Sequence, residues 1–181
     1  MFKTSDPLYL QLLNWHHDRH QYTGTNIPSV ESAMLLEKLT RDILLPLTTK
    51  FGVIKITYGF TSPELACYLQ RVSPQGTAPQ LDQHACTEVN TKGKHICSRP
   101  GAACDFIVQG YEERMHEVAQ FICQQLSFDR LYFYGRNRPI HISVSDAPLG
   151  HLQLIQQSAN GRRYPGKKAF GDKALALAQE L

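Results

Sequence analysis

The order of helix-forming and strand-forming segments predicts an α+β domain, with a small, mainly antiparallel sheet and flanking helices. Three observations support this fold class. The segments follow the order helix, strand, helix, long loop, strand, helix, strand, strand, without an internal repeat. Only four residues separate the last two strands, which suits an antiparallel hairpin. With 181 residues, 42% of them hydrophobic and 19% charged, the chain has the size and composition of one globular domain.

The N-terminal part predicts two helices before the first strand. Residues 8–20 begin apolar and end polar with three histidines, which indicates the end of a surface helix. A second helix is predicted to begin at Ser29, a residue type that favours the N-cap, and to close at Phe51-Gly52. Its core-facing residues recur every four positions, at Leu35, Leu39, Ile43 and Leu47.

The next segments predict a strand, a short helix and a long loop. Residues 53–58 alternate and are rich in β-formers, so they predict a strand. The Ser-Pro-Glu sequence at 62–64 opens a helix that runs to about Leu69. Residues 71–100 contain repeated proline and glycine breakers and predict an irregular loop. A loop of this length in a compact domain is usually functional or disordered.

The C-terminal half predicts the rest of the sheet. Strands are predicted at 102–108, 129–134 and 139–144, with a helix at 112–126 between the first two. Residues 149–181 are basic and predict a loop-like stretch with a short helix from about Asp172. We therefore expect a domain at residues 1–148 and a basic C-terminal extension at 149–181.

Composition and charge narrow the class of protein. The net charge of +3 is too small to indicate nucleic-acid binding by itself. The first residues do not resemble a signal peptide, and no apolar run approaches the roughly 18–20 residues that cross a bilayer. Five cysteines without a C-x-x-C pair predict no disulfide framework, although Cys86 and Cys97 flank one loop and could bind a metal together. We expect a cytoplasmic protein with no membrane partner; the sequence leaves the oligomeric state open.

Three short motifs place potential metal ligands beside predicted strands. They are Gln83-His84, Gly101-Ala102-Ala103-Cys104-Asp105 and Pro139-Ile140-His141. Neutral imidazole and carboxylate suit zinc, and three protein ligands with one open position are typical of a catalytic zinc. The sequence therefore predicts a zinc site formed by His84, Asp105 and His141. His95 is the alternative first ligand, and a third reading makes these residues structural: His141 satisfied in the core, Asp105 bound to backbone amides.

Five segments between Asn26 and Val144 carry a family resemblance. They are the helix end at 44–52, the strand and turn at 56–65, the pattern Gly101-x-Ala103-x-Asp105, and the strands at 128–131 and 140–143. In this order they resemble the zinc D-Ala-D-Ala carboxypeptidase family, whose fold is shared by Hedgehog signalling domains. The resemblance implies a Hedgehog/DD-peptidase-like fold in which Asp105 and His141 bind zinc.

The chain departs from this family at its first metal ligand. The family places the first histidine in a Ser-x-His motif seven residues before the aspartate, and here that position is Ser98. The resemblance then implies that residues 86–100 are an insertion and that His84 is the ligand, because a loop can grow at modest entropic cost.

Two further departures concern substrate and proton transfer. The family's Ser-Gly-Tyr-Arg-Ser arginine, which helps to hold the substrate carboxylate, is Thr61 here, and a hydroxyl cannot replace a bidentate guanidinium. The family's catalytic glutamate lies shortly before its last histidine, but residues 131–140 contain no acidic residue. The corresponding position is Tyr134 or Arg138, depending on the alignment. Thr61 and Arg138 are the candidate substrate-binding residues, and Glu88 or Tyr134 is the candidate proton carrier.

Two functions follow from these observations. The first is a divergent zinc-dependent hydrolase, metallopeptidase-like, that cleaves an amide or related bond in a peptide-like or other small substrate. The second is a non-catalytic binding or accessory module that keeps the scaffold without the chemistry, because the resemblance to Hedgehog domains implies that this fold can bind partners. Residues 131–141 also resemble a domain that accompanies bacterial DNA-modification or phage-defence proteins. Cations beside aromatic rings suit phosphates and bases, so the candidate nucleic-acid contacts are Arg162, Arg163, Lys167 and Lys168.

Overall fold

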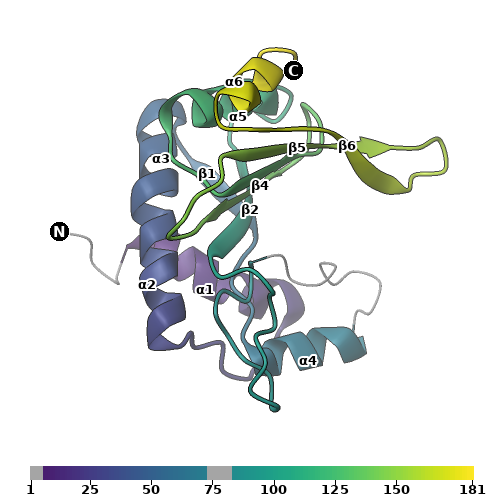
Figure 1. The fold of residues 1–181 in the computed structure, drawn as a ribbon. Helices are drawn as coiled ribbons and strands as arrows, with labels where there is room; N and C mark the ends of the chain where they lie inside the picture. The colour runs from purple at the N-terminus through teal and green to yellow at the C-terminus, as the bar shows by residue number, and fades with distance from the viewer. Residues whose placement is uncertain (1–5, 73–82) are drawn as a thin grey trace.

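The computed structural model describes residues 6–72 and 83–181, and they form an α+β fold around one six-stranded mixed sheet (Figure 1). The strands lie in the order β1-β2-β4-β3-β5-β6. The strands are β1 (Ile54–Tyr58), β2 (Ala102–Val108), β3 (Arg130–Phe133), β4 (Ile140–Val144), β5 (His151–Gln157) and β6 (Arg163–Phe170). The helices are α1 (Pro7–His20), α2 (Val30–Leu39), the π-helical turn η1 (Thr40–Leu44), α3 (Leu45–Phe51), α4 (Pro63–Val72), α5 (Met115–Gln125) and α6 (Asp172–Ala178).

The predicted α+β class is confirmed and four of the five strand pairings are antiparallel, but the sheet is larger than expected. Strands β1, β2, β4 and β3 pair antiparallel, and the predicted β3–β4 hairpin is present. Strand β5 then pairs parallel with β3, and β6 pairs antiparallel with β5. The sequence places no strand at either of these last two positions.

The expectation that residues 149–181 are loop-like is therefore wrong. Residues 151–170 continue the sheet, and the β5–β6 pair extends away from the helices (Figure 1). Most side chains of β6 are exposed, so this edge strand lacks the alternation of apolar and polar residues that reveals a half-buried strand. Pro165 and Gly166 lie inside it, and an edge strand tolerates proline because it has a side without ladder bonds. The predicted short helix after Asp172 is confirmed as α6.

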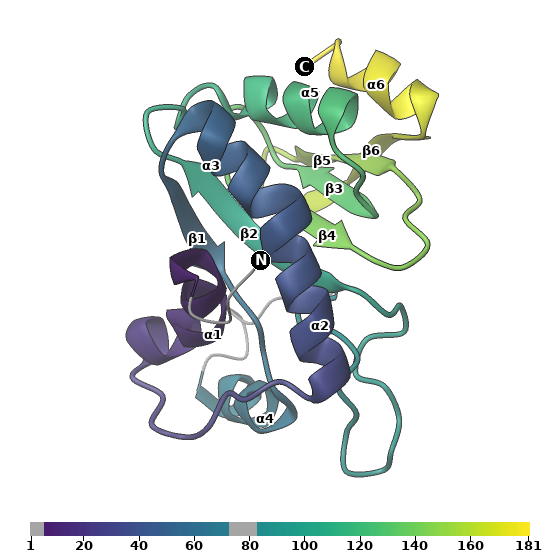
Figure 2. The ribbon, with the colours of Figure 1, turned by 90° about the vertical axis from the view of Figure 1, so that its left-hand side faces the viewer.

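The predicted long helix is present as α2, η1 and α3 in one line across the sheet (Figure 2). Ser29 is its N-cap, as predicted, and its Oγ accepts a hydrogen bond from the backbone N–H of Ser32 at 3.3 Å. The π-helical turn precedes Pro46, which has no N–H to donate to the carbonyl four residues earlier. Instead, the N–H of Leu45 donates to the carbonyl of Thr40, five residues back, so the chain continues helically.

The core lies on the sheet face that α2, α3 and α5 cover (Figure 2). Leu131, Ile142 and Cys104 pair across neighbouring strands and are fully buried against the leucines of α2. Because side chains alternate along a strand, the residues between them point to the opposite face. That opposite face carries Asp105, His141 and Tyr132, and it positions the candidate site.

Candidate metal centre

Register across the sheet aligns three of the site's side chains. Asp105 on β2 pairs with His141 on β4, and His141 pairs with Tyr132 on β3. Directly paired residues point to the same face, with their Cβ atoms about 4.5–5.5 Å apart. The antiparallel pairing thus brings together an aspartate and a histidine that are 36 residues apart in sequence.

His84 comes to the site from a turn instead of a strand. The carbonyl of the preceding residue, Gln83, accepts a hydrogen bond from the N–H of Ala103 at 3.1 Å, which ties the turn to the start of β2. The carbonyl of His84 accepts from the N–H of Thr61 at 3.0 Å. These backbone bonds hold the His84 imidazole over Asp105 from two sides.

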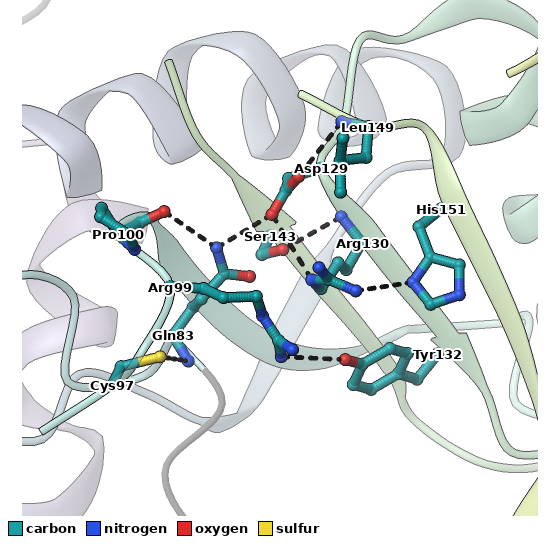
Figure 3. Close-up of polar contacts among 10 residues, drawn as sticks. All are labelled: Gln83, Cys97, Arg99, Pro100, Asp129, Arg130, Tyr132, Ser143, Leu149 and His151. Carbon is teal, nitrogen blue, oxygen red and sulfur yellow. Dashed lines mark hydrogen bonds and ion pairs between the residues drawn. The ribbon is translucent and has the colours of Figure 1, made fainter. Parts of the chain in front are cut away.

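The side chain of Gln83 anchors the same turn to the chain at Pro100 and Asp129 (Figure 3). Its Nε2 donates to the carbonyl of Pro100 at 3.1 Å and to Oδ2 of the buried Asp129 at 2.9 Å. Gly101 leaves room for this arrangement. A Cβ atom on Gly101 would lie 2.2 Å from Gln83 Nε2 and 2.5 Å from the carbonyl oxygen of Val144, so no other residue fits without displacement.

His84, Asp105 and His141 converge on one point. One ligand atom of each lies within 4.8 Å of the other two. Asp105 Oδ1 is 3.3 Å from His84 Nε2 and 2.8 Å from His141 Nδ1. Within residues 6–72 and 83–181, no other histidine, cysteine or acidic side chain joins this cluster or forms a second one. Of the two histidines considered as first ligand, His84 lies in the cluster, whereas His95 is exposed, with Nδ1 3.0 Å from the carbonyl of Thr87.

The electrostatics of the cluster favour an ionised carboxylate. Burial alone raises the pKa of Asp105, but the charge of His84 and the hydrogen bond from His141 outweigh it and lower the pKa below its ordinary value. The histidines are 3% exposed at their side chains, whereas that of Asp105 is 27% exposed. The cluster is therefore buried on the imidazole side and reached by solvent on the carboxylate side.

Aromatic rings hold both imidazoles in place. Tyr58 meets His84 edge-on at 4.6 Å between ring centroids, and His84 meets His141 at 5.0 Å. Tyr132 stacks on His141 at 4.7 Å with an interplanar angle of 14°. Such contacts limit the tilt of each imidazole ring plane.

Thr61, predicted to bind substrate, is fully buried beside a histidine of α1. Its Oγ1 lies 3.1 Å from Nε2 of His16, which is also fully buried. The expectation that the histidines near residue 20 mark only a surface helix end is thus wrong for His16. Burial, followed by the charges of His20 and His84, lowers the pKa of His16 to about 3 and keeps the ring neutral.

The candidate proton carriers, Glu88 and Tyr134, and the candidate substrate-binding residue Arg138 are not members of the cluster. Oε1 of Glu88 accepts a hydrogen bond from the N–H of Ser29 at 2.8 Å, so this carboxylate stabilises the start of α2. Tyr134 lies just beyond β3, and the guanidinium of Arg163 is 5.2 Å from its ring centroid. Arg138 is exposed in the β3–β4 turn. A role for any of them in catalysis stays a prediction.

The basic residues predicted to contact nucleic acid lie at or beside the edge strand β6. Arg162, Arg163, Lys167 and Lys168 are all exposed. Lys167 pairs with Glu180 on the C-terminal side at 2.8 Å. The remaining three lie along the outer edge of the sheet.

Sequence reasoning missed Tyr132, Gln83 and His16. Tyr132 could have been found from the hairpin register, because the four-residue turn places it opposite His141. Gln83 and His16 had no such signal, since their roles depend on contacts between distant segments.

Searches against protein-family models, curated proteins and solved structures found no match to this chain. In the described part of the chain, no helix is both long and apolar enough to span a bilayer.

Proposed function

We propose that His84, Asp105 and His141 bind a zinc ion and that the protein is a divergent metallohydrolase of the DD-peptidase-like kind. The observation that carries this proposal is the convergence of three ligand atoms within 4.8 Å. Two imidazoles and a carboxylate are a donor set that zinc prefers, and three protein ligands leave a fourth position open.

The separations of the ligand atoms support this fit. Zinc bonds of about 2.0–2.1 Å in a tetrahedron place ligand atoms roughly 3.3 Å apart. His84 Nε2 and Asp105 Oδ1 are 3.3 Å apart, and the His141–Asp105 pair at 2.8 Å has the length of a hydrogen bond. Small side-chain movements would convert the hydrogen-bonded cluster into a metal site.

A zinc ion at this site would supply Lewis-acid activation of water or of a substrate carbonyl group. The chain's own residues do the rest. Asp105 stays ionised because its pKa is lowered. Its side chain is partly exposed, so solvent reaches the cluster on this side. Tyr132 and Tyr58 hold the two imidazoles, while the buried Thr61 supports His84 through its backbone. No second carboxylate joins the cluster within the described residues, so we propose slow or atypical hydrolysis.

Metal content tests the site directly. We expect the wild-type chain to bind close to one zinc per chain and Asp105→Asn to lose it, as measured by plasma mass spectrometry after dialysis. His95→Ala is the matched control, because this exposed histidine lies in the same segment and outside the cluster. Zinc retained by Asp105→Asn, or lost by His95→Ala, would contradict the assignment.

Hydrolysis assays test the chemistry separately. We expect weak turnover of D-Ala-D-Ala peptides by the zinc-loaded chain and none by His141→Ala. Turnover near the common enzymatic rate of about 10 per second would show that an efficient proton carrier is present.

The second candidate function is nucleic-acid binding by β6. It is favoured by one observation: Arg163 and Lys168 are exposed on the edge strand, with the exposed Arg162 just before it, and Arg163 lies over the ring of Tyr134. A mobility shift of short single-stranded and duplex DNA that weakens with salt, and is lost in Arg162→Ala/Arg163→Ala, would support it. Absence of a shift at low salt would remove it.

A further inference from the structure

The turn that carries His84 has a left-handed backbone on both sides of this residue. Gln83 has a φ of +62°, and Cys86 has a φ of +47°. Residues other than glycine, asparagine and aspartate rarely adopt this region, because Cβ comes too close to the following carbonyl oxygen. Such conformations persist only where the surrounding structure holds them, and they cluster at functional sites. The contacts of Gln83, which directly precedes the candidate ligand, therefore determine where the His84 imidazole points.

Gln83 is fully buried, and its contacts differ in strength (Figure 3). Its N–H donates to Sγ of Cys97 at 3.2 Å, and sulfur is a weak acceptor. Its carbonyl accepts from the N–H of Ala103 at 3.1 Å. Its Nε2 donates to the carbonyl of Pro100 at 3.1 Å and to Oδ2 of Asp129 at 2.9 Å. A carboxylate is the strongest acceptor among these, so the bond to Asp129 is the main restraint on the side chain.

Asp129 is itself held firmly (Figure 3). The residue is 4% exposed, and its Oδ1 accepts from the N–H of Leu149 at 3.1 Å. Its Oδ2 accepts from Gln83 and lies 3.7 Å from Nε of Arg130. Its backbone N–H donates to the carbonyl of Ser143 on β4 at 2.8 Å. Because the backbone and both carboxylate oxygens are bonded, Asp129 offers Gln83 an acceptor at a fixed place.

We propose that Asp129 and Gln83 are positioning residues for the metal centre. Neither is a member of the cluster, so both act through His84. The bond between them keeps Gln83 in its left-handed conformation, which directs Nε2 of His84 toward Oδ1 of Asp105, 3.3 Å away. The inference rests on the proposed function for the metal itself.

Substitutions at Gln83 separate its side-chain bond from its backbone conformation. Gln83→Ala removes the bond and keeps the cost of a left-handed backbone. We expect zinc affinity to fall about tenfold, the low end of the effect of replacing a group bonded directly to a metal ligand. Gln83→Gly removes the same bond but adopts a φ of +62° without that cost, so zinc affinity should fall only about threefold. In regular structure glycine is the more harmful of the two, so a purely structural role predicts the opposite order.

Asp129→Asn tests the other end of the bond. It keeps the shape of the side chain but replaces one acceptor oxygen by a donor NH₂ group. Either Gln83 or the N–H of Leu149 then lacks its acceptor. We expect zinc affinity to fall about tenfold here as well.

Two measurements follow the His84 ring with and without metal. Competition with a chromogenic chelator gives the zinc affinity of each full-length chain. In the zinc-depleted chains, the ring-nitrogen NMR signals of His84 show its contact with Asp105. We expect this contact in the wild type and in Gln83→Gly, and its loss in Gln83→Ala and Asp129→Asn.

Thr40→Val is the control for general loss of stability. The hydroxyl of this fully buried residue donates to the carbonyl of Leu36 at 2.9 Å, inside the long helix. Its removal should lower stability in urea unfolding and leave the zinc affinity and the His84 signals unchanged. A loss of zinc affinity in Thr40→Val as large as that in Gln83→Ala would overturn the inference.

The remaining outcomes separate positioning from metal binding. Wild-type His84 signals in both Gln83→Ala and Asp129→Asn overturn the inference, and so does equal zinc affinity in Gln83→Ala and Gln83→Gly. A wild-type chain that binds no zinc contradicts the proposed function. The His84 signals of the zinc-depleted chains then still decide whether Gln83 and Asp129 position the ring. If Gln83→Ala fails to fold, Asp129→Asn and Gln83→Gly give the same comparison.

Discussion

The ring of Tyr132 lies nearly parallel to the imidazole of His141, with 4.7 Å between the ring centroids. The two residues face each other across the β3–β4 hairpin, so the stack is fixed by backbone pairing. A metal-ligating histidine is usually oriented by a hydrogen-bonded group outside the ligand set, and loss of that group commonly weakens metal binding 10–100-fold. At the proposed zinc site, the ring of Tyr132 would orient His141 by stacking instead.

We therefore predict that Tyr132→Ala weakens zinc binding about tenfold, because the His141 ring gains freedom to rotate. Tyr132→Phe keeps the stack and removes only the hydroxyl that accepts from Arg99, so its zinc affinity should stay within about threefold of wild type. Competition with a chromogenic chelator measures both. Equal affinity in Tyr132→Ala and wild type would show that the stack does not orient the ligand.

Gly101 provides a test of how the His84 turn is seated. We predict that Gly101→Ala destabilises the chain by about 3 kcal/mol and reduces zinc binding, because the added Cβ collides with Gln83 and with the backbone of Val144. Urea unfolding and zinc content measure the two effects.

Gly93→Ala is the control for this change. Gly93 has a φ of +70° and no neighbouring atom within 4 Å of an added Cβ, so only backbone conformation is affected. We expect a cost of about 1–2 kcal/mol there and unchanged zinc content. If Gly101→Ala cost no more than Gly93→Ala, the contact with Gln83 would be unimportant.

Local signals predicted much of this fold, and tertiary pairing decided the rest. The N-cap at Ser29 was predicted from its residue type, the strand at 102–108 from its composition, and the β3–β4 hairpin from its four-residue turn. Strands β5 and β6 did not, because β6 is exposed, contains Pro165 and is held by pairing with β5.

The candidate site divides in the same way. The three motifs and their order predicted that His84, Asp105 and His141 would lie together, and they do. The sequence could not show that Glu88 would accept a hydrogen bond at the start of α2 and that Thr61 would be buried against His16, since both contacts join distant segments.

Thr61 and His16 form a buried polar pair, and we predict that it contributes to stability without affecting the metal. Thr61→Val keeps the shape of the side chain and leaves His16 Nε2 without its partner, at a cost of about 1–3 kcal/mol. Zinc content should be unchanged, because Thr61 supports His84 through its backbone N–H.

Thr49→Val is the matched control in urea unfolding. Its hydroxyl also makes one hydrogen bond, to the carbonyl of Leu45 at 3.0 Å, but on the exposed surface of α3. The expected change is below about 0.5 kcal/mol. Equal costs at the two positions would mean that the buried pair adds nothing to stability.

We predict that protonation of His151 lowers the stability of the folded chain in mild acid. Its pKa is lowered to about 4 in the folded chain, by burial first and then by Arg130, Lys168 and Arg99, whereas an unfolded chain has the ordinary value near 6.5. The unfolded state therefore binds a proton at this histidine before the folded state does. The stabilisation from neutral His151 is complete above pH 6.5 and is lost as the pH falls toward 4. Over this window it contributes a slope of at most about 1.4 kcal/mol per pH unit to the free energy of unfolding.

His151→Gln removes the titrating group, so its free energy of unfolding should fall less steeply between pH 6.5 and 4 than that of the wild type. Urea unfolding of both zinc-depleted chains in one buffer series measures the two slopes, and every other titrating group is common to both. Parallel curves would show that His151 titrates alike in the folded and unfolded chains, and that the cations around it exert no such field.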